Sequence, residues 1–119
     1  MLFSRLIHTL KSTRNYCKQY LPSEEWILKK NNIYHMGLSK NATKQFGEII
    51  YLEYQFNKED IIKENDEIVV LESVKATDSI KAPFDCVLIE NNDELEDDQE
   101  QINKDPENTW IIKISEHEA

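Results

Sequence analysis

One lysine, Lys75, lies near the centre of the segment from Val69 to Pro83, between two short apolar runs. Apolar runs on either side of a short polar centre predict two strands that fold back on each other, with the lysine at or near the tip of the hairpin. A lysine at such a tip has a solvated ammonium group and no packing role. The pattern therefore favours a side chain that an enzyme modifies over one that stabilises the fold.

The residues around this lysine resemble the lipoyl-attachment motif of glycine cleavage system H proteins. The matching stretch is Glu72-Ser73-Val74-Lys75-Ala76-Thr77. Further segments follow the order and spacing of that family across roughly residues 20–114, at positions 23–26, 36–39, 46–53, 92–95, 103–106 and 110–114. A lone Val-Lys-Ala would carry little information, whereas this ordered set is specific.

The resemblance implies a covalent lipoate on Lys75. An amide link removes the lysine charge and creates a long flexible arm, whose reactive disulfide supplies the chemistry. A lipoylating enzyme would recognise the hairpin through the neighbouring residues Glu72, Ser73, Val74, Ala76 and Thr77. In the family, polar and acidic side chains shelter the loaded amine, and the possible contacts in this chain are Ser23, Glu25 and Asp78.

The resemblance also implies the partners. A pyridoxal-phosphate-dependent glycine decarboxylase would pass an aminomethyl group to the arm, a folate-dependent aminomethyltransferase would take the carbon unit, and dihydrolipoamide dehydrogenase would reoxidise the dithiol. The chain itself would be a carrier and not an enzyme. It has no Gly-rich phosphate loop, no paired Cys/His metal spacing and no nucleophile elbow. A monomer is expected, because a carrier must visit several enzymes.

Alternatives to this function remain open. Family members usually have Ser-Asp where this chain has Asp78-Ser79, and a shift by one residue reverses the face of a strand. A protein with this change could be a lipoyl donor or relay that passes lipoate to other enzymes. It could also be an unmodified interaction module in which Lys75 is ordinary. A biotin carrier is disfavoured, because biotinyl lysines usually lie between methionines.

Composition limits the class of protein. With 119 residues, of which 39% are hydrophobic and 31% charged, the chain has room for one small domain. The net charge of −9 is uneven, because all 23 acidic side chains lie beyond residue 20. An acidic domain argues against a nucleic-acid partner, which requires a basic face. No apolar run approaches membrane-spanning length, so no membrane partner is expected.

Residues 1–20 are typical of an organelle-targeting peptide of the mitochondrial type. The segment is basic and lacks acids, and its apolar residues Leu2, Leu6, Ile7 and Leu10 would share one face of a helix. An ordinary amphipathic helix is the alternative. Residues 21–119 would then be the lipoyl-binding domain, located in the mitochondrial matrix or a mitochondrion-derived organelle. Cys17 lies in this leader, and Cys86 is expected to be a small buried hydrophobic side chain.

The domain is predicted to be mostly β. Strands are expected at residues 25–30, 33–38, 48–56, 68–73, 80–83, 84–90 and 110–114, with turns at 31–32 and 65–66. Many short strands separated by turns predict a flattened barrel or sandwich. The resemblance implies two antiparallel sheets of the lipoyl-domain type (a barrel-sandwich hybrid) with one or two short helices.

Several side chains have predicted positions. Ser39 and Gly47 would cap a helix over residues 39–46, and the Asp97/Glu100 spacing predicts a capping box that starts a second helix at 97–102. The alternation in the strand at 48–56 predicts Ile49, Tyr51 and either Tyr54 or Phe56 inward. Both tryptophans, Trp26 and Trp110, are expected in the core.

Overall fold

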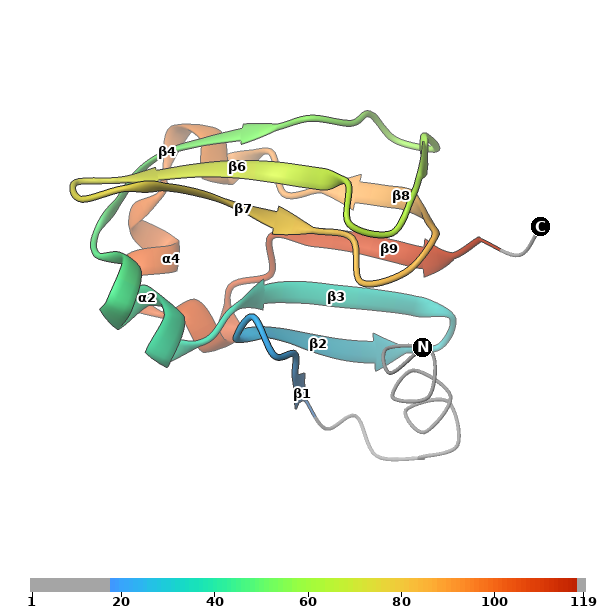
Figure 1. Cartoon of the computed structure of the whole chain (residues 1–119), viewed down its shortest axis with the longest axis horizontal. Coiled ribbons are helices and arrows are strands. Elements are labelled where there is room, and N and C mark those ends of the chain that lie inside the picture. The colour runs from blue at the N-terminus through green and yellow to red at the C-terminus, as the bar shows by residue number, and fades with distance from the viewer. Residues whose placement is uncertain (1–17, 118–119) are drawn as a thin grey trace.

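The computed structural model describes residues 18–117 and contains two antiparallel sheets. Six strands form the larger sheet, in the order β1-β2-β3-β9-β8-β5, and three form the smaller, in the order β4-β6-β7. Figure 1 shows the smaller sheet stacked on the larger, with short helices at one end. This mostly β architecture confirms the predicted fold class. The strands are β1 Gln19–Tyr20, β2 Glu25–Lys30, β3 Ile33–Leu38, β4 Ile49–Tyr54, β5 Ile61–Ile62, β6 Glu67–Ser73, β7 Thr77–Lys81, β8 Cys86–Asn91 and β9 Ile112–Glu116.

The first hairpin has the predicted bounds. β2 and β3 pair in register from Glu25 opposite Leu38 to Lys30 opposite Ile33. Asn31 in the turn has a φ of 59°, a left-handed conformation that asparagine tolerates better than most residues. The turn chemistry is local, which is why the sequence pattern was sufficient to place both strands.

Other strands differ from their predicted bounds. β7 begins at residue 77 and not at 80, while β8 and β9 each begin two residues later than expected. The two-residue strands β1 and β5 were not predicted. Both are edge strands that exist through pairing with β2 and β8, so no sequence period marks them.

The strand β4 contains a bulge that overturns one prediction. The pairing with β6 shifts register between Ile49 and Tyr51, so that Ile49 and Leu52 are buried while Tyr51 is 45% exposed. A bulge inserts one residue into the alternation and reverses the faces beyond it. The inward placement of Tyr51 was therefore wrong, although Tyr54 is half-buried as one of the predicted options.

The first helix confirms its predicted caps. α2 (Lys40–Phe46) begins after Ser39, whose Oγ accepts a 3.0 Å hydrogen bond from the Ala42 N–H. It ends at Gly47, whose φ is 95° and ψ is −174°. This backbone region is essentially restricted to glycine, so the residue fixes the point at which the helix ends.

The acidic segment forms two short helices, not the single one predicted. α3 (Glu94–Asp97) ends where the capping box was expected to begin, and α4 (Glu100–Lys104) follows after Gln99. No side-chain cap hydrogen bond precedes α4. The capping box was therefore wrong. Leu95 and Ile102 are buried, which indicates that core contacts position these helices.

Apolar side chains from both sheets form the core, including Ile27, Met36, Ile62, Leu88 and Ile112, all fully buried. Cys86 is also fully buried, as predicted, and burial raises the pKa of its thiol to about 12, with smaller contributions from Asp85 and Asp66. Such a thiol is inert at neutral pH.

The two tryptophans have different environments. Trp26 is 3% exposed, and its indole N–H donates a 2.9 Å hydrogen bond to the Pro106 carbonyl. Trp110 is only half-buried, with the Lys113 ammonium 4.3 Å from its ring centroid. The core placement was correct for Trp26 and wrong for Trp110, because the latter lies just before β9 on the surface side.

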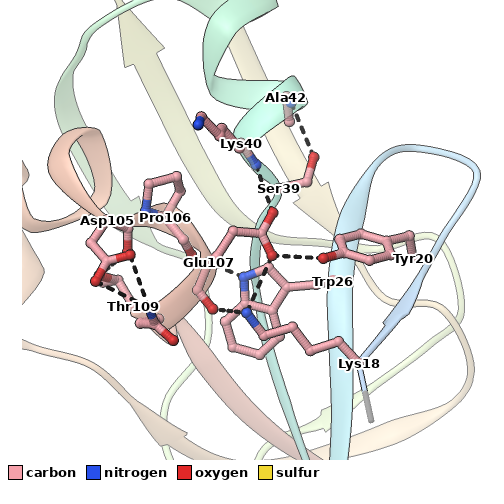
Figure 2. Close-up of polar contacts among 11 residues, drawn as sticks. Lys18, Tyr20, Trp26, Ser39, Lys40, Ala42, Asp105, Pro106, Glu107 and Thr109 are labelled. Atoms are coloured by element: carbon pink, nitrogen blue, oxygen red, sulfur yellow. Dashed lines mark hydrogen bonds and ion pairs between the residues drawn. The ribbon is translucent and has the colours of Figure 1, made fainter.

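Glu107 joins residues 18–20 to the rest of the domain (Figure 2). It lies in the 3-10 turn η1 (Pro106–Asn108), and its carboxylate accepts hydrogen bonds from Tyr20 (2.7 Å), Lys18 (3.2 Å) and the Lys40 N–H (2.8 Å). The Lys18 ammonium also donates to the Glu107 carbonyl and lies 4.6 Å from the centroid of the Trp26 ring.

Residues 18–20 thus belong to the fold, while the rest of the predicted targeting segment, residues 1–17, lies outside the described residues. In the described part of the chain, no helix has the length and apolar character needed to cross a membrane. That same part holds no cluster of three or more His, Cys, Asp or Glu side chains suited to a metal ion.

Candidate functional site

Lys75 lies at the tip of the hairpin formed by β6 and β7, as predicted. Residues 74–76 connect the two strands, and Lys75 is exposed. In Figure 1 this hairpin extends beyond the sheet at the end where α2 lies. The tip therefore presents a primary amine to solvent, which is the nucleophile that amide formation requires.

Ser73 holds the backbone of this tip in place. Its Oγ accepts hydrogen bonds of 3.1 Å from the N–H groups of both Lys75 and Ala76, and its hydroxyl donates 2.7 Å to the Phe46 carbonyl. The Ser73 N–H also donates 2.8 Å to the Ala76 carbonyl. One side chain therefore closes the turn and joins it to the end of α2, so that the lysine has a defined orientation.

Gly47 lies directly under the Lys75 side chain. A methyl group built on Gly47 would lie 3.4 to 3.6 Å from the Cε, Cδ and Cγ atoms of Lys75. The lysine stem therefore crosses the junction between α2 and β4, and does not extend straight into solvent. Sequence reasoning identified Gly47 only as a helix end; its contact with the lysine depends on the hairpin.

An acidic pocket opens between the first hairpin and β7. Its volume is about 500 Å³, within the usual range for small-molecule sites, and its polar lining includes Ser23, Glu25, Asp78, Ser79 and Lys81. Phe46 and Leu71 contribute apolar walls. All three predicted arm contacts thus line one pocket, even though more than fifty positions separate Ser23 from Asp78.

Glu25 is the buried acid of this pocket. The residue is 5% exposed, and desolvation by burial raises the pKa of its carboxyl above the ordinary value. A hydrogen bond from Ser23 opposes this rise, the nearby Asp78 carboxylate adds to it, and the Lys81 ammonium reduces it. A carboxyl in this environment is stabilised in its ionised form by an arriving cation.

The order Asp78-Ser79 does not remove the acid from the pocket. Asp78 shares the strand face of the buried Ile80, and both Asp78 and Ser79 line the pocket. Ser79 donates a 2.7 Å hydrogen bond from its hydroxyl to Glu67, which draws its side chain away along β6. Asp78 is an exposed residue at the pocket, so the inverted order still leaves a carboxylate in the pocket lining.

The remaining motif residues lie on the surface. Glu72 is exposed on β6 and pairs with Thr77 and Tyr51 across the sheet, while Val74 is 64% exposed. Neither Glu72 nor Val74 is among the residues that line the pocket. Lys81 was not singled out from the sequence, because only the fold brings it to Glu25.

Comparisons with known proteins agree with this geometry. The family model described as glycine cleavage H-protein matches residues 18–119. The chain belongs to that family. A glycine cleavage system H protein from Dinoroseobacter shibae is 38% identical over 96 residues, covering 80% of this chain and 78% of the relative. One from Staphylococcus epidermidis is 33% identical over 97 residues, covering 81% and 76%.

A solved structure supports the fold. The crystal structure of a glycine cleavage system H protein from Mycobacterium marinum superposes with a TM-score of 0.76 at 18% identity, covering 86% of this chain and 85% of that one. Membership of the H-protein family assigns the chain the role of a lipoyl carrier in glycine cleavage, not that of a catalyst. The names of the relatives do not favour the alternative of a lipoyl relay.

Proposed function

We propose that Lys75 is the lipoyl attachment site and that this chain carries the aminomethyl group of glycine between enzymes. The observation that carries the proposal is an exposed lysine at a hairpin tip with its stem over Gly47, on a hairpin whose strand β7 contributes Asp78 to the lining of an acidic pocket. When bound, lipoate supplies a disulfide that is reduced as one sulfur accepts the aminomethyl carbon released by decarboxylation.

The residues of this chain position and shelter the cargo. Ser73 orients the lysine backbone, and the pocket offers carboxylates to the cationic amine. Glu25 would gain most from that cation, because it is a buried acid whose ionised form lacks full solvation. A hydrogen-bonded ion pair in the pocket would hold the amine away from solvent until an enzyme withdraws it.

The partners follow from this role. They would be a pyridoxal-phosphate-dependent glycine decarboxylase, a folate-dependent aminomethyltransferase, dihydrolipoamide dehydrogenase and a lipoylating enzyme. A tethered arm raises the effective concentration of the cargo at each of these active sites. A monomer fits the need to leave one enzyme and meet the next.

The basic leader supports a location in the mitochondrial matrix or a mitochondrion-derived organelle. We propose that the cut lies before Lys18, and thus earlier than residue 20. Lys18 and Tyr20 bind Glu107, and β1 pairs with β2, so removal of residues 18–20 would leave Glu107 without two of its donors. The N-terminal residue of the isolated protein tests this placement directly.

Intact-mass analysis with peptide mapping tests the attachment site. Wild-type protein co-produced with a lipoylating enzyme is expected to be heavier by one lipoyl group, carried on Lys75. Lys75→Arg should remain unmodified and fold normally, and Lys58→Arg, on an exposed loop residue, should be lipoylated like the wild type. An unmodified Lys75 in every molecule, or a lipoyl group on another lysine, would refute the proposal.

A further inference from the structure

Three large apolar side chains are exposed beside the lysine hairpin. They are Ile50 (50% exposed), Tyr51 (45%) and Val74 (64%), here called the hairpin patch. The Val74 N–H donates a 3.2 Å hydrogen bond to the Glu48 carbonyl, and Tyr51 pairs with Glu72 across the sheet. Figure 1 shows the start of β4 and the tip of the β6–β7 hairpin at the same end of the smaller sheet.

The bulge in β4 exposes two consecutive side chains, Ile50 and Tyr51. The side chain of Asn103 accepts a 2.9 Å hydrogen bond from the Ile49 N–H and donates 3.0 Å to the Ile49 carbonyl. These two bonds pair the outer N–H and C=O groups of Ile49 at the bulge, where β4 has no second partner strand among residues 18–117. Regular alternation would turn one residue of the pair Ile50-Tyr51 inward, whereas the bulge leaves both in solvent.

Carboxylates surround this apolar surface. Glu48, Glu53 and Glu72 are all exposed residues next to the patch in the sequence or across the sheet. The Tyr51 phenol donates a 3.3 Å hydrogen bond to the Glu53 carboxylate, whose charge raises the pKa of that phenol, with smaller contributions from Glu72 and Glu96. An apolar centre with an acidic rim complements a surface with an apolar depression surrounded by Lys and Arg.

We propose that the hairpin patch is the docking surface for the enzymes that take in the Lys75 arm, with a Lys/Arg-rimmed apolar contact on the enzyme side. The inference rests on the proposed function, because it places the partner's active-site entrance at Lys75. An enzyme that encloses the lysine covers the adjacent Val74 and the neighbouring start of β4. A second copy of this chain fits less well, because it would bring two acidic rims together.

A double variant at two patch residues outside the lipoyl motif tests the docking surface. The double variant Ile50→Ser/Tyr51→Ser is prepared in lipoylated form, verified by mass, and supplied at varied concentration to the glycine decarboxylase. Its KM as a carrier substrate should rise about tenfold or more, with kcat at saturation nearly unchanged, since buried apolar contacts dominate docking energies. Ile61→Ser is the matched control, because Ile61 is 57% exposed on β5 of the other sheet.

A charge variant gives an independent readout. Glu53→Gln should raise the same KM at low ionic strength, and the difference should vanish at high salt, because rim charges act through screened attraction. It removes no apolar contact, so it remains informative if the double variant unfolds. Unfolding midpoints measured by circular dichroism separate docking effects from folding effects.

The outcomes are distinct. An unchanged KM in a folded double variant, an equal rise in Ile61→Ser, or association of the free chain through the patch in sedimentation would overturn the docking surface. If wild-type protein cannot be lipoylated or loaded, the carrier function itself fails, and the docking inference falls with it. If wild type is active and only the patch inference fails, the carrier role stands.

Discussion

The phenol of Tyr20 donates a 2.7 Å hydrogen bond to Oε1 of Glu107, a residue 87 positions later in the chain. This contact joins the edge strand β1 to the turn η1, and Lys18 and the Lys40 N–H bind the same carboxylate. One acid thus secures the beginning of the domain, the start of α2 and the segment that leads to β9.

Removal of that acid should destabilise the domain. Glu107→Ala is expected to lower the free energy of unfolding by about 1–2 kcal/mol, because three donors lose a charged acceptor. Urea denaturation followed by tryptophan fluorescence gives the value. Glu96→Ala, on the exposed surface of α3, is the control and should change little. Equal stability of the two variants would contradict the role of Glu107.

The same acid should make stability depend on pH. Burial alone would raise the pKa of Glu107, but the hydrogen bonds from Lys40, Tyr20 and Lys18 outweigh it and hold the pKa below 4.5. Because the folded-state pKa is depressed, the stabilisation is complete above the ordinary pKa and is lost as the pH falls through the folded-state value. The stability difference between wild type and Glu107→Gln should therefore shrink below about pH 4.5 and stay constant above it.

The stability contributed by Glu25 should depend on pH in the opposite direction. Burial raises its pKa, so the ionised carboxylate costs stability at neutral pH, and that cost is relieved as the pH falls through the raised value. Glu25→Gln is expected to raise the unfolding midpoint at pH 7, with the gain disappearing on acidification. Glu94→Gln, at an exposed residue, is the control and should leave the unfolding midpoint unchanged at both pH 7 and acidic pH.

The same substitution should weaken the hold on the cargo. Lipoylated Glu25→Gln, once loaded, should lose its aminomethyl group to water faster than wild type, with formaldehyde and ammonia released and a free thiol left on the arm, since the amine loses a carboxylate partner. Mass spectrometry of the loaded carrier over time gives the rate. Equal release from wild type and variant would mean that the pocket does not receive the amine.

Gly47→Ala should affect both stability and lysine presentation. A φ of 95° with a ψ of −174° costs a non-glycine residue about 1–3 kcal/mol, and the added methyl would also contact the Lys75 stem. The expected result is a lower unfolding midpoint together with slower lipoylation, measured by intact mass over time. Ala42→Gly in α2 is a comparison that weakens the helix without reaching the lysine; if it slows lipoylation as much, the effect of Gly47 is only one of stability.

Ser73→Ala should loosen the hairpin tip. The N–H groups of Lys75 and Ala76 and the carbonyl of Phe46 lose their partner, and the cost is about 1–3 kcal/mol if water does not replace it. Amide exchange at residues 75 and 76 should accelerate. Ser73→Thr keeps the hydroxyl, so the amides of residues 75 and 76 should stay protected from exchange. Slow exchange in Ser73→Ala, or fast exchange in Ser73→Thr, would contradict this role of Ser73.

Local chemistry was enough to predict much of the framework. The Asn31 turn set the β2–β3 hairpin, Ser39 and Gly47 set the ends of α2, and the apolar runs around Lys75 placed it at a hairpin tip. In each case the determining residues lie within a few positions of the structure they specify. Turn and capping preferences act over that range, so sequence patterns record them.

Only the tertiary structure decided the rest. At the bulge in β4, which reversed the predicted face of Tyr51, the Ile49 backbone is hydrogen-bonded by Asn103, 54 positions away. Contacts of this kind are made by isolated polar residues at long sequence separation, which leave no period to detect. The sequence by itself determined that Lys75 lies at a hairpin tip. The packing of the two sheets decided that β7 of this hairpin lines an acidic pocket and that exposed apolar side chains of β4 lie next to the tip.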